Sequence, residues 1–363
     1  MRFLWLALFV LAVASAQAAS FDCKKAQTHL EIAVCALPEL SADDEKLAVA
    51  YKASLAGLSP ETVHALRGDE AEWLRYVATV CEANAKQTRK ELSKCILPYY
   101  QERLELLTQS AQTVAGTRIV MRSSLQAEPF GRGSHWNEYA SDDNDGFGRK
   151  CLIWPQAEST EPEWKAWNAI VKQRVFTALD ESLTAAGFIK LAEWNAGSII
   201  AYSKASAVYA VPGRVSVDIA SQYTVQPLYG MYYPAEKSES FHWLLAQQRE
   251  LKVDDVFTPG SGWLKVVKAC CESKVLGGDT NADNLHFEKA AQMPRYWDFS
   301  LEGLTIQFDL SSLNVDSDKS GLQQNLSALE SNTTDMDSSQ PMPVTVPWSA
   351  LKPYLVQGFS LPQ

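Results

Sequence analysis

Three charged residues, Asp44, Glu70 and Arg103, lie on the apolar faces of predicted helices, where an unpaired charge is costly. Two carboxylates held together are the groups that a glycoside hydrolase uses for acid–base chemistry. An arginine beside them would lower their pKa values, whereas a general acid needs a raised pKa. We therefore expect a structural ion cluster in which Arg103 bonds one or both carboxylates, and we assign no catalytic residue.

The chain has no motif for a nucleophile or a metal ion. Gly260-Ser261-Gly262 follows a proline and is typical of a turn rather than of a nucleophile elbow. The five histidines have no ligand spacing, so zinc is not expected. Neither acidic stretch, 141–146 or 279–283, has the glutamate that closes a calcium loop, and both are interpreted as solvated loops. No cofactor and no metal are predicted.

Two groups of side chains are candidates for contact with a protein partner. Tyr229, Tyr232 and Tyr233 lie in a predicted loop, and tyrosine is common at binding surfaces. The alternative is that these rings pack on the sheet edge beneath them. The second group is acidic and lies on outer helix faces: Glu39, Asp43, Asp69 and Glu72.

The N-terminus has the pattern of a secretory signal. Arg2 is followed by an apolar run, 3–13, and by the small-x-small cleavage site Ala16-Gln17-Ala18. This run is shorter than the roughly 20 residues that span a bilayer, and no other long apolar segment exists. We expect residues 1–18 to be removed and the mature protein to be periplasmic or secreted, with no membrane span.

The mature chain is acidic. Without Arg2 it has 32 basic and 43 acidic residues, which gives a net charge of −11. This balance argues against nucleic acid and anionic membranes as partners, and it favours a basic protein.

Export to an oxidising compartment predicts disulfide bonds among the seven cysteines. Thr28 and Glu31 match a capping box, which would start a short helix. The residues before this helix can run back alongside it and bring Cys23 next to Cys35. We therefore predict a Cys23–Cys35 bond.

The other cysteines are assigned by position. Cys81 ends one predicted helix and Cys95 lies near the start of the next, so a bond between them would staple the turn. Cys270 and Cys271 are neighbours and are not expected to bond each other. We expect one of these two cysteines to pair with Cys151, and we assign this role to Cys270.

The pattern of apolar residues predicts two domains. Helical periodicity over 28–35, 41–58, 60–81 and 88–107 indicates an all-α, disulfide-stapled domain, 19–109. A linker and irregular segment, 110–150, is expected next. A helix over 164–185 is followed by short strands, which indicates an α+β domain, 151–363, with a mainly antiparallel sheet. Within it, the Ser- and Asp-rich stretch 311–343 is expected to be a mobile insert. The strands are predicted over 152–155, 198–203, 207–210, 215–223, 241–246, 304–310 and 344–348.

The helical domain resembles the LprI-type lysozyme-inhibitor domain. The resemblance covers about 85 residues and implies an extracytoplasmic helical domain with two disulfides. Val77 departs from the family pattern, which often has arginine there. The residues that carry the resemblance are Cys23, Glu31, Cys35, Leu40, Asp44, Leu47, Tyr51, Trp73, Cys81, Cys95, Tyr99 and Arg103.

The second domain resembles the extracellular part of the anti-sigma-V factor RsiV and related envelope proteins. The pattern runs from Pro155-Gln156 through Asn168 and Val215-Ser216-Val217 to the segments 301–308 and 344–351. The usual Gly-Ala-His turn of that family is replaced here by residues 227–234.

Together these features predict a non-enzymatic envelope protein that binds a protein partner, with a basic lysozyme as the candidate. Lysozymes are usually basic, so an acidic inhibitor would be steered towards them. Two alternatives stay open: a hydrolase of cell-wall glycan or peptide, and a structural or stress-related envelope factor.

Overall fold

The computed structural model describes residues 19–82, 88–110, 112–129, 147–185, 196–227, 233–275, 288, 291–308 and 342–362. The chain divides into two compact units. The first contains the residues up to Ala56 and Val77–Thr108, and the second contains Gly57–Tyr76 and the residues from Gln109 onward.

The predicted helices of the N-terminal region are confirmed. They are α1 (His29–Ala36), α2 (Pro38–Leu55), α3 (Pro60–Glu82) and α4 (Arg89–Gln109), and a short 3-10 helix that was not predicted, η1 (Cys23–Lys25), precedes them. Helix α1 begins at the expected capping box, because the Glu31 amide donates to Thr28 Oγ1 at 3.2 Å and the Thr28 amide donates to Glu31 Oε2 at 2.9 Å. The α3 helix contributes residues to both units.

Two disulfides stabilise the first unit. The bonds are Cys23–Cys35 and Cys81–Cys95, as predicted. The Ser93 hydroxyl of α4 also donates to the Ala33 carbonyl of α1 at 2.8 Å. A short helix of this length is marginal alone, so these links help to hold α1 in place.

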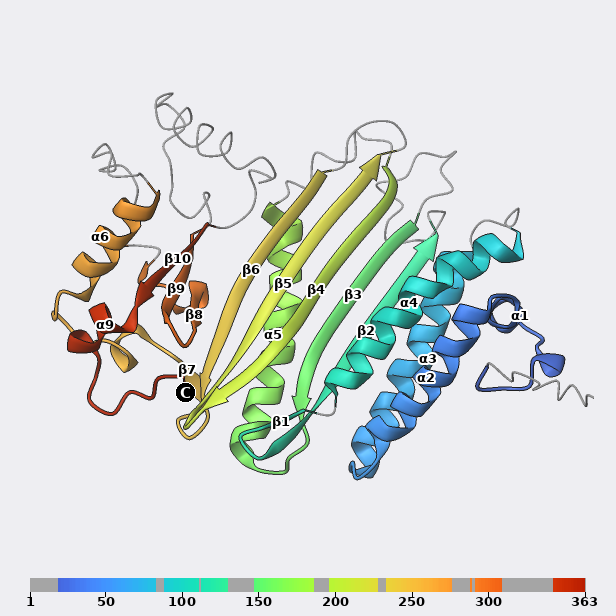
Figure 1. The fold of residues 1–363 in the computed structure, drawn as a ribbon, viewed down its shortest axis with the longest axis horizontal. Helices are drawn as coiled ribbons and strands as arrows, with labels where there is room; N and C mark the ends of the chain where they lie inside the picture. Colours follow the sequence, from blue (N-terminus) through green and yellow to red (C-terminus); the bar gives the residue numbers. More distant parts are fainter. Residues whose placement is uncertain are drawn as a thin grey trace, which may run out of the picture. The chain divides into compact units, whose positions relative to one another are not determined.

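The second unit is built on a seven-stranded sheet with strand order β1-β2-β3-β4-β5-β6-β7 (Figure 1). All neighbouring strands are antiparallel except β3 and β4. That parallel pair requires a crossover connection, and α5 (Pro162–Ala185) lies between the two strands in the sequence. The strands are β1 (Thr113–Val114), β2 (Thr117–Pro129), β3 (Phe147–Ala157), β4 (Ala196–Val211), β5 (Arg214–Pro227), β6 (Tyr233–Leu244) and β7 (Arg249–Glu250).

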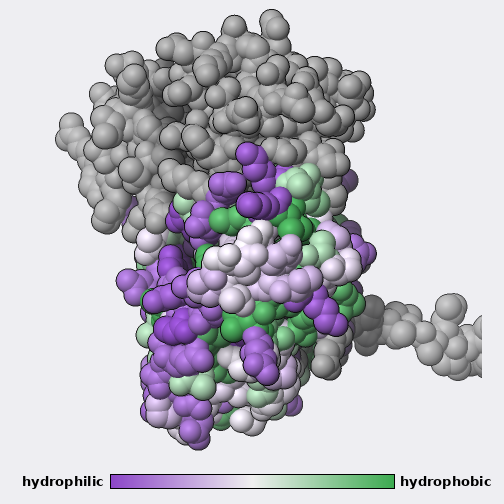
Figure 2. Space-filling view, turned by 90° about the vertical axis from the view of Figure 1, so that its left-hand side faces the viewer, coloured by the Kyte–Doolittle hydropathy of each residue, from purple (hydrophilic) through white to green (hydrophobic). Residues whose placement is uncertain are grey.

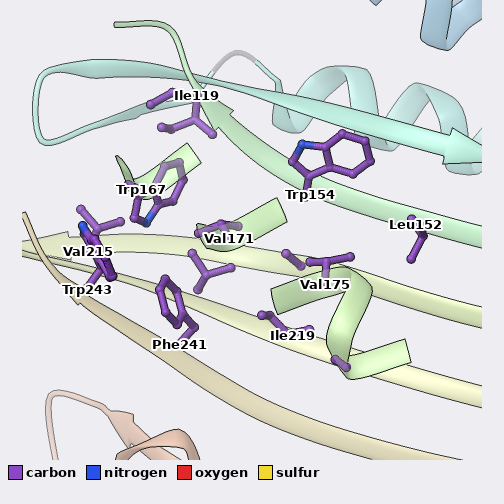
Figure 3. Close-up of a cluster of buried hydrophobic side chains, with 14 of the residues drawn as sticks. Ile119, Leu152, Trp154, Trp167, Val171, Val175, Val215, Ile219, Phe241 and Trp243 are labelled. Atoms are coloured by element: carbon purple, nitrogen blue, oxygen red, sulfur yellow. The ribbon is translucent and has the colours of Figure 1, made fainter. Parts of the chain in front are cut away.

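Helix α5 covers one face of this sheet with an apolar core. Its side chains Trp167, Val171 and Val175 are fully buried and meet inward residues of the strands (Figure 3). On β5 these inward residues are Val215 and Ile219, and they alternate with polar residues as a strand with two different faces requires.

A smaller sheet, β10-β9-β8, forms a second core in the same unit. In that core Phe257 stacks on Trp263 with ring centres 4.1 Å apart, and Trp297 is fully buried. Its elements are η4 (Val253–Asp255), α6 (Trp263–Val275), η6 (Pro294–Tyr296), β8 (Trp297–Phe299), β9 (Gly303–Phe308), β10 (Met342–Pro347), α9 (Trp348–Leu351) and η7 (Lys352–Tyr354). The predicted fold class, a helical region followed by a mainly antiparallel α+β region, is confirmed.

The expected irregular structure over 110–150 is wrong in three places, and the first is the short strand β1 at 113–114. Residues 117–129 form β2, and residues 147–150 begin β3. The two strands pair along eleven residue positions, from Ile119↔Ala157 to Pro129↔Phe147. This long-range pairing determines the strand, and the local sequence shows it only weakly.

The predicted bond between Cys151 and Cys270 is also wrong. Cys151, Cys270 and Cys271 are thiols. Cys151 lies on β3, where its Sγ donates to the Tyr76 hydroxyl at 3.3 Å, whereas Cys270 lies on α6 with its Sγ 3.7 Å from the Thr345 carbonyl. They belong to different packed regions of the second unit.

Several predictions lie outside the described residues. They concern the signal sequence 1–18, the acidic stretches 141–146 and 279–283, most of the insert 311–343, Tyr229 and Tyr232. Tyr233 begins β6.

Candidate functional site

Two acidic residues of α3, Asp69 and Glu72, hold strand β2 along the edge that extends beyond the two-residue strand β1. Asp69 is 6% exposed and forms a two-bond ion pair with Arg122, at 2.6 and 3.0 Å. Its Oδ2 also accepts the backbone N–H of Ser123 at 3.2 Å. Asp69 is therefore not available to a partner, and the prediction that it lies on an outer binding face is wrong.

Glu72 continues the same arrangement one helical turn further on. Its Oε1 accepts the backbone N–H of Leu125 at 3.1 Å. Nearer the start of β2, the Ser110 hydroxyl accepts the N–H of Met121 and the Gln112 carbonyl accepts the N–H of Ile119, both at 2.9 Å. An exposed strand edge is a template for unwanted pairing. Here four outward N–H groups in a row, those of Ile119, Met121, Ser123 and Leu125, already have acceptors.

The other two acidic candidates differ from each other. Asp43 is buried, bonds Lys46 at 2.8 Å and accepts from Gln101 at 3.5 Å, so its prediction as a surface contact is also wrong. Glu39 is exposed in the first turn of α2 and remains available.

The predicted ion cluster has buried members. Asp44 is 8% exposed and accepts the backbone N–H of Ser20 at 2.7 Å, and Arg103 is 4% exposed. Glu70 is half-buried. The bond from Arg103 to the carboxylates stays a prediction.

A polar cluster that sequence reasoning missed lies on the sheet face opposite α5. Arg214, Ser216 and Asp218 alternate with the core residues of β5, and Ser240 and His242 do the same on β6. The Ser240 hydroxyl donates to Asp218 at 2.9 Å. The available signal was the strict alternation of polar and apolar residues over 214–219.

The three residues of β8 contact three different strands of the large sheet. The Trp297 carbonyl is 2.9 Å from His242 Nε2 on β6, and Asp298 accepts from the Tyr209 hydroxyl of β4 at 3.2 Å. The Phe299 ring lies under the guanidinium of Arg214 on β5, with Cζ 3.9 Å from the ring centre. This cluster therefore joins the two sheets.

The geometry fixes the tautomer of His242. A carbonyl can only accept, so Nε2 carries the hydrogen, and Nδ1 accepts from the Ser216 hydroxyl at 2.8 Å. Burial lowers the pKa of His242 to about 3, and the nearby Arg214 acts in the same direction. A serine bonded to a neutral histidine can act as a nucleophile with its base. Here Ser216 is 1% exposed, so this pair cannot meet a polymeric substrate.

Burial perturbs the other ionisable groups of the cluster. It lowers the pKa of Arg214 to about 10, and two guanidinium nitrogens, Nε and Nη2, have no hydrogen-bond partner among the described residues. It raises the pKa of Asp218 and of Tyr209, and the Asp298 charge raises both further.

A small cavity lies beside His242 and measures about 20 Å³. It is lined also by Arg174, Glu239, Glu250 and Arg295. That volume is room for roughly one water molecule.

In the part of the chain that the structure describes, no group of three or more His, Cys, Asp or Glu residues is arranged to hold a metal ion. None of the helices there is both long and apolar enough to span a bilayer.

Among known protein families, one is similar to the N-terminal segment of this chain. The sequence model of the family described as "Lysozyme inhibitor LprI" matches residues 22–124. The matched segment contains α1 to α4, both disulfides, β1 and the first part of β2. It thus includes Arg122 and Ser123 of β2, which donate to the Asp69 carboxylate of α3.

Two solved structures are similar to the chain. One is a DUF3298 family protein from Pseudomonas aeruginosa PAO1, with 12% identity, 68% of this chain and 98% of that chain covered, and a TM-score of 0.40. The other is a member of the DUF3298 family from Bacteroides fragilis NCTC 9343, with 9% identity, coverage of 68% and 96%, and a TM-score of 0.38. No curated protein matches the chain. The resemblance of the second domain to RsiV stays a prediction.

Proposed function

We propose that this protein binds and inhibits a lysozyme in the bacterial cell envelope and is not an enzyme. The observation that carries the proposal is the match of residues 22–124 to the lysozyme-inhibitor family LprI. Two disulfides in that segment agree with an oxidising compartment. We further propose that residues 1–18 are a cleaved signal sequence.

Charge supports the choice of partner. The full chain carries a net charge of −10, and lysozymes are usually basic. Opposite net charges accelerate association and favour the correct partner. The resemblance of the second domain to the extracellular part of RsiV points to the same kind of partner, since both families include lysozyme-binding members.

The proposal is tested by a lysis assay. Purified mature protein is added to a cell-wall suspension together with lysozymes of several types. At least one lysozyme should be slowed in proportion to the added protein, and raised salt should weaken the effect because it screens charge attraction. Unchanged lysis with every lysozyme rejects the proposal. Release of wall fragments by this protein alone would instead support the hydrolase alternative.

A further inference from the structure

The turn between β8 and β9 displays an isolated apolar side chain. Leu301 is 70% exposed, and the next residue, Glu302, is exposed as well. Among the described residues, the other exposed large hydrophobics are Val49 at 66% and Leu74 at 38%, and both lie on helices. Figure 2 shows the side that carries α6 and α9, where hydrophobic side chains occur in small groups between hydrophilic ones. Leu301 is the most exposed of the three large hydrophobic side chains named above.

The turn is closed by its own hydrogen bonds. The Ser300 amide donates to the Gly303 carbonyl at 3.1 Å, and the Gly303 amide donates to the Ser300 hydroxyl oxygen at 3.2 Å. That hydroxyl in turn donates to the Gly303 carbonyl at 3.0 Å. Leu301 and Glu302 form the tip between these two residues.

The turn is also fixed to the strand and helix beside it. Trp348 Nε1 donates to the Ser300 carbonyl at 2.9 Å, and the Trp348 amide donates to the Glu302 carbonyl at 3.2 Å. A Cβ at Gly303 would lie 2.2 Å from the Val346 carbonyl oxygen, so only glycine permits this approach. The backbone on both sides of Leu301 is therefore held before any partner arrives.

Such an arrangement suits an anchor residue. A side chain presented on a pre-ordered backbone loses little conformational freedom on binding, so more of its burial appears as affinity. Exposed Pro347, which pairs with Gly303 across the β9–β10 ladder, adds apolar surface beside the tip. Glu302 places a negative charge next to the apolar anchor.

We propose that Leu301 is the anchor through which this protein docks on a basic lysozyme, entering an apolar pocket with a cationic side chain at its rim. The inference rests on the proposed function and assigns its contact surface to the second unit. The pairing of an apolar anchor with Glu302, on a chain of net charge −10, fits a basic partner.

The test compares three variants of the full mature protein for binding to the lysozyme that the wild type inhibits. Leu301→Ala should weaken the affinity roughly ten- to hundredfold, the range that corresponds to burying one leucine side chain. Leu301→Asp should weaken it at least as much. Val49→Asp is the matched control, because it removes an equally exposed aliphatic side chain from α2 and should leave the affinity unchanged. All three should unfold at the same temperature as the wild type, since both positions are exposed.

The outcomes separate the two proposals. If the wild type binds and both Leu301 variants bind equally well, the anchor is refuted and the proposed function stands. Loss of binding in Val49→Asp alone would place the contact on the helices and also refute the anchor. If the wild type binds no lysozyme, the proposed function fails and the anchor fails with it.

Discussion

Asp69 accepts bonds from the Arg122 guanidinium and from the Ser123 amide, so its loss would leave a cation and a backbone donor without their acceptor. Breaking one side of a buried ion pair costs about 3–5 kcal/mol. We therefore expect Asp69→Ala to lower the free energy of unfolding by that amount in urea titrations. Glu61→Ala, an exposed change on the same helix, is the control and should alter it by less than about 0.5 kcal/mol. Equal effects of the two changes would show that Asp69 does not hold β2.

His242 should make stability depend on pH. Its pKa is about 3 in the folded state and 6.5 in the reference state, because burial beside Arg214 disfavours the charged ring. Below about pH 6.5 the histidine is protonated in the unfolded chain but stays neutral in the folded chain. The contribution of neutral His242 to stability is therefore complete above pH 6.5 and is lost as the pH falls towards 3. The pKa values of Asp218 and Tyr209 in the same cluster are also shifted by burial, so only a difference between two proteins isolates the contribution of the histidine.

The measurement is urea unfolding at pH 7 and pH 4.5 for the wild type and His242→Gln. The wild type should lose more stability than the variant between these two pH values. A parallel loss in both proteins would mean that the His242 ring titrates normally in the fold.

Among the elements, the α3–α4 connection depends on its disulfide. Cys81 and Cys95 are 14 residues apart, and closing a loop of about that size stabilises a protein by about 3 kcal/mol. The double change Cys81→Ser with Cys95→Ser should lower the free energy of unfolding by this amount.

The pairing of the cysteines is a separate prediction. Mass mapping without reductant should find the bonds Cys81–Cys95 and Cys23–Cys35, with three cysteines reactive as thiols after unfolding. A bond from Cys151 to Cys270 or Cys271 would contradict the structure.

Local signals in the sequence predicted some elements well. The capping box at Thr28 and the stripes of apolar residues located the four helices, since both are properties of neighbouring residues. Strand β4 was predicted as two pieces, 198–203 and 207–210, yet it runs through Ala196–Val211. A register shift between Ala205 and Val208 interrupts its alternation, as expected for a bulge.

Features that depend on distant partners were not predictable. Nothing in the local sequence of β2 indicates that it pairs with β3. Asp69 and Glu72 have the spacing of surface residues on a helix, and only the position of β2 beside α3 shows that they bond its backbone. The buried polar cluster around His242 is of the same kind. Its members come from four strands that the chain brings together only after folding.

At the scale of the whole molecule, the larger part of α3 belongs with the sheet. Gly57–Tyr76 group with the second unit, and Ser59 and Thr62 there also bond Glu158 after β3, at 2.8 and 2.6 Å. A fragment of residues 19–109 would lack Glu158 and therefore these two hydrogen bonds. We expect its amides over 57–76 to exchange with solvent faster than in the full chain, whereas α1 and α4 keep their protection through the disulfides. Equal protection over 57–76 would show that α3 needs no support from the sheet.

The central claim is that this acidic envelope protein binds a basic lysozyme. Its most direct test is a calorimetric titration of the purified mature protein with lysozymes of several types, each at low and at physiological ionic strength. The account predicts saturable binding to at least one lysozyme, with lower affinity at the higher salt concentration because charge attraction is screened. No binding to any lysozyme at either ionic strength would contradict it.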